Sequence, residues 1–103
     1  MDIIDNIQSV FDFTSGMDLK AFAADIKTVY AVDRCFEIIG EATRQLPEEF
    51  ILQYDDIDWH KMIAFRNVLI HEYFRIERGI EWNIIQNTLP SLKEKIENLL
   101  DKI

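Results

Sequence analysis

The chain has 103 residues, of which 49% are hydrophobic and 29% charged, and this composition suits a single domain spanning residues 1–103. The formal net charge of −8 argues against a general nucleic-acid binder, because Lys and Arg supply most non-specific affinity for phosphate. No apolar run approaches the ~20 residues needed to span a bilayer, so we expect no membrane association. A single cysteine, Cys35, excludes an intramolecular disulfide, and its apolar neighbours predict a buried thiol.

The N-terminus and the charge distribution narrow the class of protein further. The chain opens Met-Asp-Ile-Ile-Asp, acidic where a secretory signal is basic, so we expect a cytoplasmic protein. Residues 59–79 hold four Lys and Arg against two Glu, a balance of +2, which leaves −10 for the remainder. The acidic remainder suits a basic protein partner, whereas the basic segment suits a phosphate-bearing ligand.

Apolar residues recur at three- and four-residue intervals, which predicts an all-α fold, an antiparallel bundle of four to five helices. A first helix covers residues 2–13. Asp18 is a candidate N-cap for a long segment, in one or two pieces, that Pro47 stops after Leu46. The apolar stripe of this segment consists of Phe22, Ile26, Val29, Tyr30, Phe36, Ile39 and Thr43.

The second half continues the helical pattern. Pro47 is expected at the first position of a short helix that ends near Gln53, and an acidic loop follows at 54–57. Asp58 is a candidate N-cap for a helix over residues 59–73, and a turn at 75–79 leads to helices over 80–88 and 91–103. The residues expected in the core are Trp59, Trp82 and the phenylalanines, and His60 is expected at the surface.

Two features of the long helix are informative. Gly40 interrupts it where alanine would be about 1 kcal/mol more favourable, which predicts close packing of another helix at this position. Glu37 and Glu41 are expected to be solvated or to serve packing.

The segment from Arg66 to Tyr73 carries the chemistry of this sequence, because it reads R-x4-H-x-Y at the end of a predicted helix. RNA supplies its own nucleophile, the 2′-hydroxyl. Cleavage therefore needs a group that moves a proton near neutral pH, which His71 provides, and a cation for the phosphate, which Arg66 provides. Neither a metal nor another cofactor is required. Asn67 would orient the substrate or His71.

Helical geometry constrains how this pair acts. On a regular helix Arg66 and His71 diverge by about 140°, whereas Arg66 and Tyr73 lie almost above one another. Three arrangements would let the two residues act together. The helix could loosen before His71, a phosphate could lie across the helix edge with Arg66 reaching around, or two copies of the motif could face each other in a homodimer. We favour the homodimer, because a two-fold axis would double the positive charge in one groove.

A purely structural role for the arginine is the competing interpretation. Arg66 falls on the apolar stripe of Ile63, Ile70 and Tyr73, where a buried cation needs an acidic partner. Asp33, a charge on the stripe of the long helix, is the candidate partner.

Two sequence blocks resemble the HEPN ribonucleases, and within them the HepT-like toxins of toxin–antitoxin pairs. Residues 31–42 (AVDRCFEIIGEA) resemble the long-helix signature of these toxins. Residues 57–59 (IDW), followed by Arg66 and Asn67, resemble the approach to their motif. The likeness covers nearly the whole chain, and Arg66, His71 and Tyr73 match the motif residue for residue.

The resemblance implies a HEPN-like homodimer that cleaves RNA in its cleft without a metal. It also implies a type VII-like system in which a minimal, MntA-type nucleotidyltransferase antitoxin transfers AMP from ATP to Tyr73. Many members carry a small residue between the histidine and the tyrosine. Here Glu72 occupies this position and places an anion beside the expected phosphate site. The alternative function is a non-catalytic helical module that pairs with a nucleotidyltransferase and binds a nucleotide.

Overall fold

The computed structural model describes residues 2–102, and they form helices joined by short turns, with no strand among them. The predicted all-α class is therefore confirmed. The elements are α1 (Asp2–Thr14), α2 (Leu19–Ala24), α3 (Ile26–Arg44), α4 (Glu48–Gln53), α5 (Trp59–His71), the 3-10 turn η1 (Tyr73–Arg75), α6 (Arg78–Asn83), the π-helical turn η2 (Ile84–Thr88) and α7 (Leu89–Lys102). None of these helices combines the length and apolarity needed to cross a bilayer.

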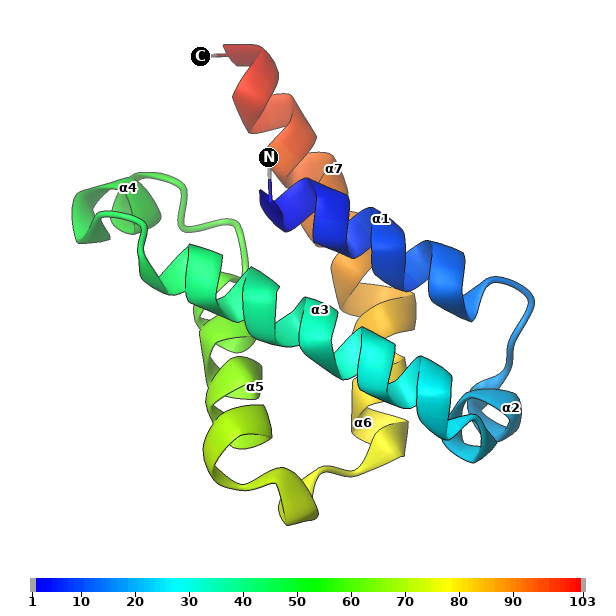
Figure 1. Cartoon of the computed structure of the whole chain (residues 1–103). Helices are drawn as coiled ribbons and strands as arrows, with labels where there is room; N and C mark the ends of the chain where they lie inside the picture. The colour runs from blue at the N-terminus through cyan, green and yellow to red at the C-terminus, as the bar shows by residue number, and fades with distance from the viewer. Residues whose placement is uncertain (1, 103) are drawn as a thin grey trace.

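Helix α3 is the central element, because it packs against α1 on one side and against α5 on the other (Figure 1). Figure 1 shows α1 and α3 running in opposite directions, with α5 descending on one side of the molecule. The chain turns at η1 and returns along α6, η2 and α7, antiparallel to α5. The motif segment therefore lies on α5 and on the turn where the chain reverses.

Short polar caps set the boundaries in the first half of the chain. The Asp18 carboxylate accepts from the backbone N–H of Ala21 at 2.8 Å, which confirms the predicted N-cap. Asp25 accepts from the N–H of Thr28 at 3.2 Å and begins α3, so the predicted long segment is in two pieces. Pro47 is the N-cap of α4 rather than its first helical residue, because its extended ψ of 142° lies outside the helix.

Three boundaries in the second half differ from the sequence prediction. Asp58 occupies the N-cap position of α5 but makes no side-chain capping bond. Helix α5 ends at His71, two residues earlier than predicted, because Glu72 leaves helical geometry with φ −139°. The two predicted C-terminal helices form one continuous run from Arg78, which contains the π-helical turn instead of a break. Pro90 explains that turn, since it has no N–H to donate four residues back and its ring crowds the carbonyl there.

The core joins apolar side chains of every long helix, and Cys35 and Trp59 are buried as predicted. The stripe prediction is wrong at Ile26 and Tyr30, which are 60% and 59% exposed because no described helix covers this side of the first turns of α3. The assignment of all phenylalanines to the core is also wrong, since Phe13 and Phe74 are 45% and 101% exposed. Trp82 is only partly buried, and His60 is exposed as predicted.

Gly40 is the point of closest approach between α3 and α5, which confirms the packing inferred from the sequence. A Cβ atom placed on Gly40 would overlap the Cβ of Arg66 and lie 2.8 Å from its Cγ. It would also lie 2.9 Å from the Met62 carbonyl oxygen, which belongs to the α5 backbone and cannot swing aside. Only glycine therefore allows α5 to lie at its present distance from α3.

We predict that Gly40→Ala lowers the free energy of unfolding by about 1–2 kcal/mol. Overpacking a helix contact costs about 1–3 kcal/mol, which outweighs the helix-propensity gain of about 1 kcal/mol. Gly79→Ala in α6 is the matched control, because the nearest atom to its Cβ would be Leu19 Cδ2 at 4.0 Å. This control should be neutral or stabilising in urea unfolding. Equal effects of the two substitutions would show that Gly40 is not a packing constraint.

Candidate functional site

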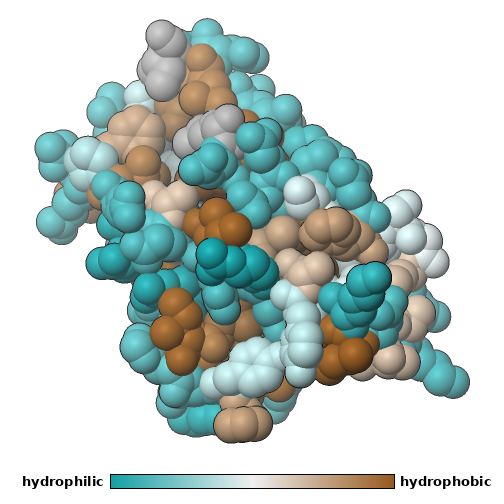
Figure 2. All heavy atoms as spheres, viewed as in Figure 1, coloured by the Kyte–Doolittle hydropathy of each residue, from teal (hydrophilic) through white to brown (hydrophobic). Residues whose placement is uncertain are grey.

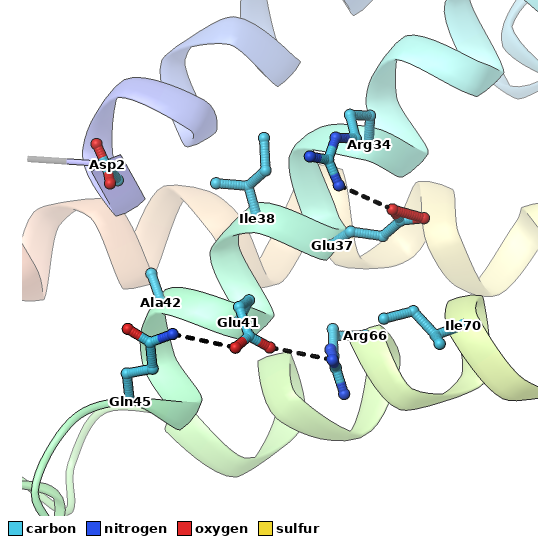
Figure 3. Close-up of a pocket in the computed structure, with 9 residues that line it drawn as sticks. All are labelled: Asp2, Arg34, Glu37, Ile38, Glu41, Ala42, Gln45, Arg66 and Ile70. Carbon is cyan, nitrogen blue, oxygen red and sulfur yellow. Dashed lines mark hydrogen bonds and ion pairs between the residues drawn. The ribbon is translucent and has the colours of Figure 1, made fainter.

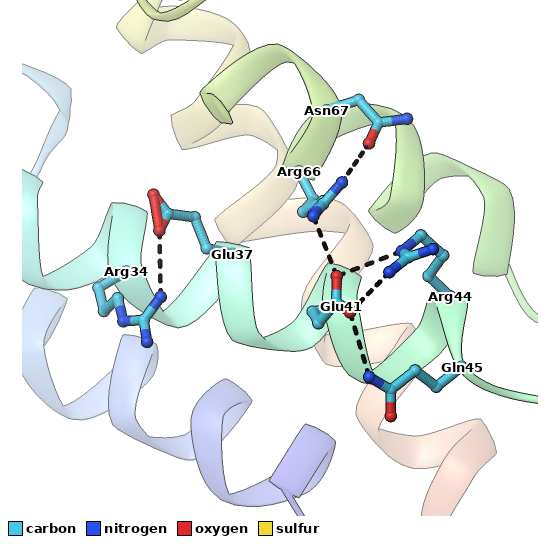
Figure 4. Close-up of polar contacts among 7 residues, drawn as sticks. All are labelled: Arg34, Glu37, Glu41, Arg44, Gln45, Arg66 and Asn67. Carbon is cyan, nitrogen blue, oxygen red and sulfur yellow. Dashed lines mark hydrogen bonds and ion pairs between the residues drawn. The ribbon is translucent and has the colours of Figure 1, made fainter. Parts of the chain in front are cut away.

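Arg66 extends from α5 to α3 and is held there by several contacts (Figure 4). Its Nη2 lies 3.0 Å from Oε2 of Glu41, and its Nη1 donates to Oδ1 of Asn67 at 2.9 Å. The stem rests on Gly40, and the side chain is 18% exposed. Asp33 was the predicted structural partner, and this prediction is wrong because the residue that reaches Arg66 across the helix crossing is Glu41.

Glu41, which the sequence predicts to be solvated or to serve packing, pairs with two cations. Besides Arg66, it accepts from Nη2 of Arg44 at 2.8 Å and from Nε2 of Gln45 at 3.1 Å. The hydrogen bond from Arg44 is the largest cause that lowers the pKa of Glu41, followed by that from Gln45 and by the charges of both arginines. One carboxylate thus serves two guanidinium groups, and the cluster keeps a positive charge. The only sequence signal was its place directly after Gly40.

A hollow of about 360 Å³ lies beside this cluster, between α3 and α5 (Figure 3). Arg66 and Glu41 form one side of it, and Arg34, which pairs with Glu37 at 3.3 Å, forms another. The Nε atom of Arg66 is buried and has no hydrogen-bond partner among the described residues. Protein groups therefore satisfy the guanidinium only in part.

His71 lies in a different hollow at the end of α5, with Glu72, Tyr73 and Arg75 among its lining residues. Its imidazole is exposed and makes no hydrogen bond or ion pair with residues 2–102. Helix α5 continues without a break through His71, so the alternative in which the helix loosens before this residue is wrong. Within one chain the predicted pair therefore faces two hollows, which only Ile70 lines in common.

Tyr73 does not lie above Arg66 as predicted, because α5 ends before it and the chain turns. Its ring lines the hollow of His71, but its hydroxyl does not lie free at the rim. The hydroxyl donates to Oδ2 of Asp33 at 3.1 Å and accepts from Nη2 of Arg78 at 2.9 Å. Burial raises the pKa of Tyr73, while the hydrogen bond from Arg78 opposes this shift.

These contacts belong to a buried polar network that sequence analysis missed. Nη1 of Arg78 donates to the two Asp33 oxygens at 3.0 and 3.1 Å and to Oε1 of Glu81 at 2.6 Å. Glu81 is fully buried, and this burial, together with the hydrogen bond and charge of Asp33, raises its pKa to about 9. The raised pKa favours the protonated form of Glu81, although the hydrogen bond and charge of Arg78 oppose this shift, and the cation Arg78 also pairs with the anion Asp33. The network ties the turn after α5 to both α3 and α6.

The side chains at the two hollows offer a fixed guanidinium, an exposed imidazole and a phenol. Among residues 2–102, no group of three or more His, Cys, Asp and Glu side chains is arranged to hold a metal ion. Glu72, the anion of the motif, is paired with Arg75 at 2.8 Å.

Comparison with known proteins identifies the family. No solved structure matches the chain. The chain is 41% identical to a protein of Methanocaldococcus jannaschii named "Putative RNase", over 99% of this chain and 84% of the relative. It is 38% identical to a protein of Thermococcus cleftensis named "Probable ribonuclease HepT", over 95% of this chain and 89% of the relative. The family described as "Ribonuclease HepT-like" matches residues 3–99. The chain therefore belongs to the HepT-like ribonuclease family.

Proposed function

We propose that this single-domain protein is a metal-independent endoribonuclease toxin, with Arg66 and His71 as its catalytic residues. The observation that carries the proposal is that the guanidinium of Arg66 is held in place but only partly hydrogen-bonded, in a chain that belongs to a ribonuclease family. Gly40 and Glu41 fix its position, yet its Nε has no hydrogen-bond partner among residues 2–102, and the exposed His71 follows five residues later. An arginine that served packing alone would be expected to have its hydrogen bonds satisfied.

The proposed reaction uses the 2′-hydroxyl of RNA as the nucleophile. His71 removes the hydroxyl proton, the 2′-oxygen attacks the adjacent phosphorus, and the bond to the 5′-oxygen breaks. The leaving oxygen takes a proton from the imidazolium or from water, so the products are a cyclic phosphate and a 5′-hydroxyl. Arg66 stabilises the negative charge that develops on the phosphate. Asn67, which accepts from Nη1 of Arg66, positions the guanidinium rather than His71.

The active unit in this proposal is a homodimer. Arg66 and His71 face different hollows of one chain, and they lie about 7.5 Å apart along the axis of α5. If two α5 helices pack antiparallel about a two-fold axis at the level of Val68, Arg66 of one chain lies opposite His71 of the other. The exposed face of α5 carries Asn67 and His71, with the exposed Ile70 on one flank and the partly buried Val68 on the other, so a partner helix could pack along it.

The charge distribution supports RNA as the substrate despite the acidic chain. Glu41 is shared by two guanidinium groups, and Arg75 neutralises Glu72, so neither carboxylate leaves an unopposed anion beside the motif. Two copies facing each other would place both basic segments along one groove.

We further propose that a nucleotidyltransferase antitoxin silences the toxin by transferring AMP to Tyr73. The Tyr73 hydroxyl attacks the α-phosphorus of ATP, pyrophosphate leaves, and the phenol proton passes to a base. The hydroxyl must first leave Asp33 and Arg78, which hold it in the structure. The added phosphodiester would bring negative charge and bulk to the hollow of His71, and both would oppose the binding of RNA.

The nuclease proposal predicts that cleavage of labelled single-stranded RNA survives EDTA and is lost in Arg66→Ala and in His71→Ala. General acid–base catalysis contributes typically 10²–10⁴-fold, so the loss in His71→Ala should be of about this size. His60→Ala is the matched control, because His60 is exposed in the first turn of the same helix. Chelation that abolishes activity, together with full activity of His71→Ala, would contradict the mechanism.

The antitoxin proposal predicts one AMP on Tyr73 after coexpression with the nucleotidyltransferase, and a loss of RNA binding. Peptide mass spectrometry of residues 67–75 locates the group. Tyr73→Phe should retain nuclease activity and escape modification. Tyr30 is the internal control, because it is 59% exposed and more accessible than Tyr73. Transfer to Tyr30, or a modified Tyr73 that still binds RNA, would refute this account.

A further inference from the structure

Phe74 is the feature of the site that the proposed function leaves unused. Its side chain is 101% exposed, whereas the next most exposed aromatic residues, Tyr30 and Phe13, are 59% and 45% exposed. It stands in η1, three residues after His71, and lines the same hollow. At the lower end of the molecule, where Figure 1 places the turn after α5, Figure 2 shows hydrophobic residues beside hydrophilic ones. A single exposed phenylalanine needs no partner by itself, but Phe74 lines the hollow of His71, and this place makes it a candidate for contact with a ligand.

The turn that carries Phe74 is held in place on both sides. The Arg75 N–H donates to the Glu72 carbonyl at 2.8 Å, and the Ile76 N–H donates to the Tyr73 carbonyl at 3.2 Å. The Tyr73 hydroxyl is fixed by Asp33 and Arg78, so the residue before Phe74 is anchored in the body of the protein. The ring of Phe74 is thereby directed outward. It meets the Tyr73 ring edge-on, with centroids 6.1 Å apart and planes at 78°.

The surroundings of Phe74 favour a nucleobase as the occupant. In a nucleotide the base offers a flat apolar face and the ribose carries a phosphate, and the hollow holds an aromatic ring together with the imidazole of His71. The charged rim of Glu72 and Arg75 is a poor match for the apolar centre of a protein–protein contact.

We propose that Phe74 is a substrate-binding platform on which a base of single-stranded RNA stacks, next to the phosphate that His71 approaches. This inference rests on the proposed nuclease function and adds the residue that selects unpaired RNA. In a duplex each base already stacks on its neighbours, so stacking on Phe74 requires a base that is free to leave the helix.

The test compares four forms of the full chain: wild type, Phe74→Ala, Phe74→Leu and Phe74→Tyr. In cleavage of single-stranded RNA, Phe74→Ala and Phe74→Leu should raise KM about tenfold and leave kcat within about twofold, because a lost stacking contact weakens binding. Phe74→Tyr keeps the aromatic face and should behave as wild type. Phe13→Ala is the matched control, since Phe13 is an exposed phenylalanine at the far end of α1, and its KM should not change.

A second readout does not depend on cleavage. A 2′-O-methyl RNA oligonucleotide that contains 2-aminopurine lacks the nucleophile, and its fluorescence falls when the base stacks. Wild type, Phe74→Tyr and Phe13→Ala should quench it, whereas Phe74→Ala and Phe74→Leu should not. Active wild-type enzyme with unchanged KM and quenching in Phe74→Ala would overturn the inference and leave the nuclease proposal standing. Wild-type KM and quenching in Phe74→Leu would also overturn it. So would a Phe74→Ala protein that binds RNA less tightly because its oligomeric mass is lower than that of the wild type. Absence of any RNA cleavage by wild type would instead remove the proposed function.

Discussion

The crossing of α3 and α5 at Gly40 is the contact on which the candidate site depends. A single missing Cβ lets the stem of Arg66 lie against α3, and this approach brings its guanidinium within 3.0 Å of Glu41. Side-chain entropy normally opposes holding a long arginine in one place, and the helix crossing removes much of that freedom. Because Glu41 also pairs with Arg44, this restraint does not neutralise the cation.

A second constraint acts at the other end of the motif. Asp33, Arg78 and Glu81 form a buried polar network, and the Tyr73 hydroxyl completes it. Removing Asp33 or Arg78 would leave the other charge buried and uncompensated, so this pair stabilises one arrangement of the turn. The position of His71 at the end of α5, and of Phe74 beyond it, follows from where this network holds the chain. Any modification of Tyr73 would act on the same network.

Much of the fold could be predicted from the sequence, because periodic apolar residues, the Asp18 cap and the helix-breaking Pro47 act locally. The motif residues and the role of Gly40 could be found for the same reason. The partners of these residues could not be predicted from the sequence. Glu41 and Asp33 both lie on α3, and only the crossing angle of α3 and α5 decides which of them meets Arg66. The π-helical turn before Pro90 and the exposure of Phe74 likewise depend on how separate helices meet, which helical periodicity does not encode.

In the proposed mechanism, Arg66 and His71 act together at a site shared by two chains. The most direct measurement is the nuclease activity of an equimolar mixture of Arg66→Ala and His71→Ala chains, unfolded and refolded together. A shared site gives each mixed dimer one intact pair, since one chain supplies Arg66 and the other His71. Half of the dimers are mixed and each has one working site of two, so the account predicts about a quarter of wild-type activity. Activity no higher than that of either variant alone would contradict it.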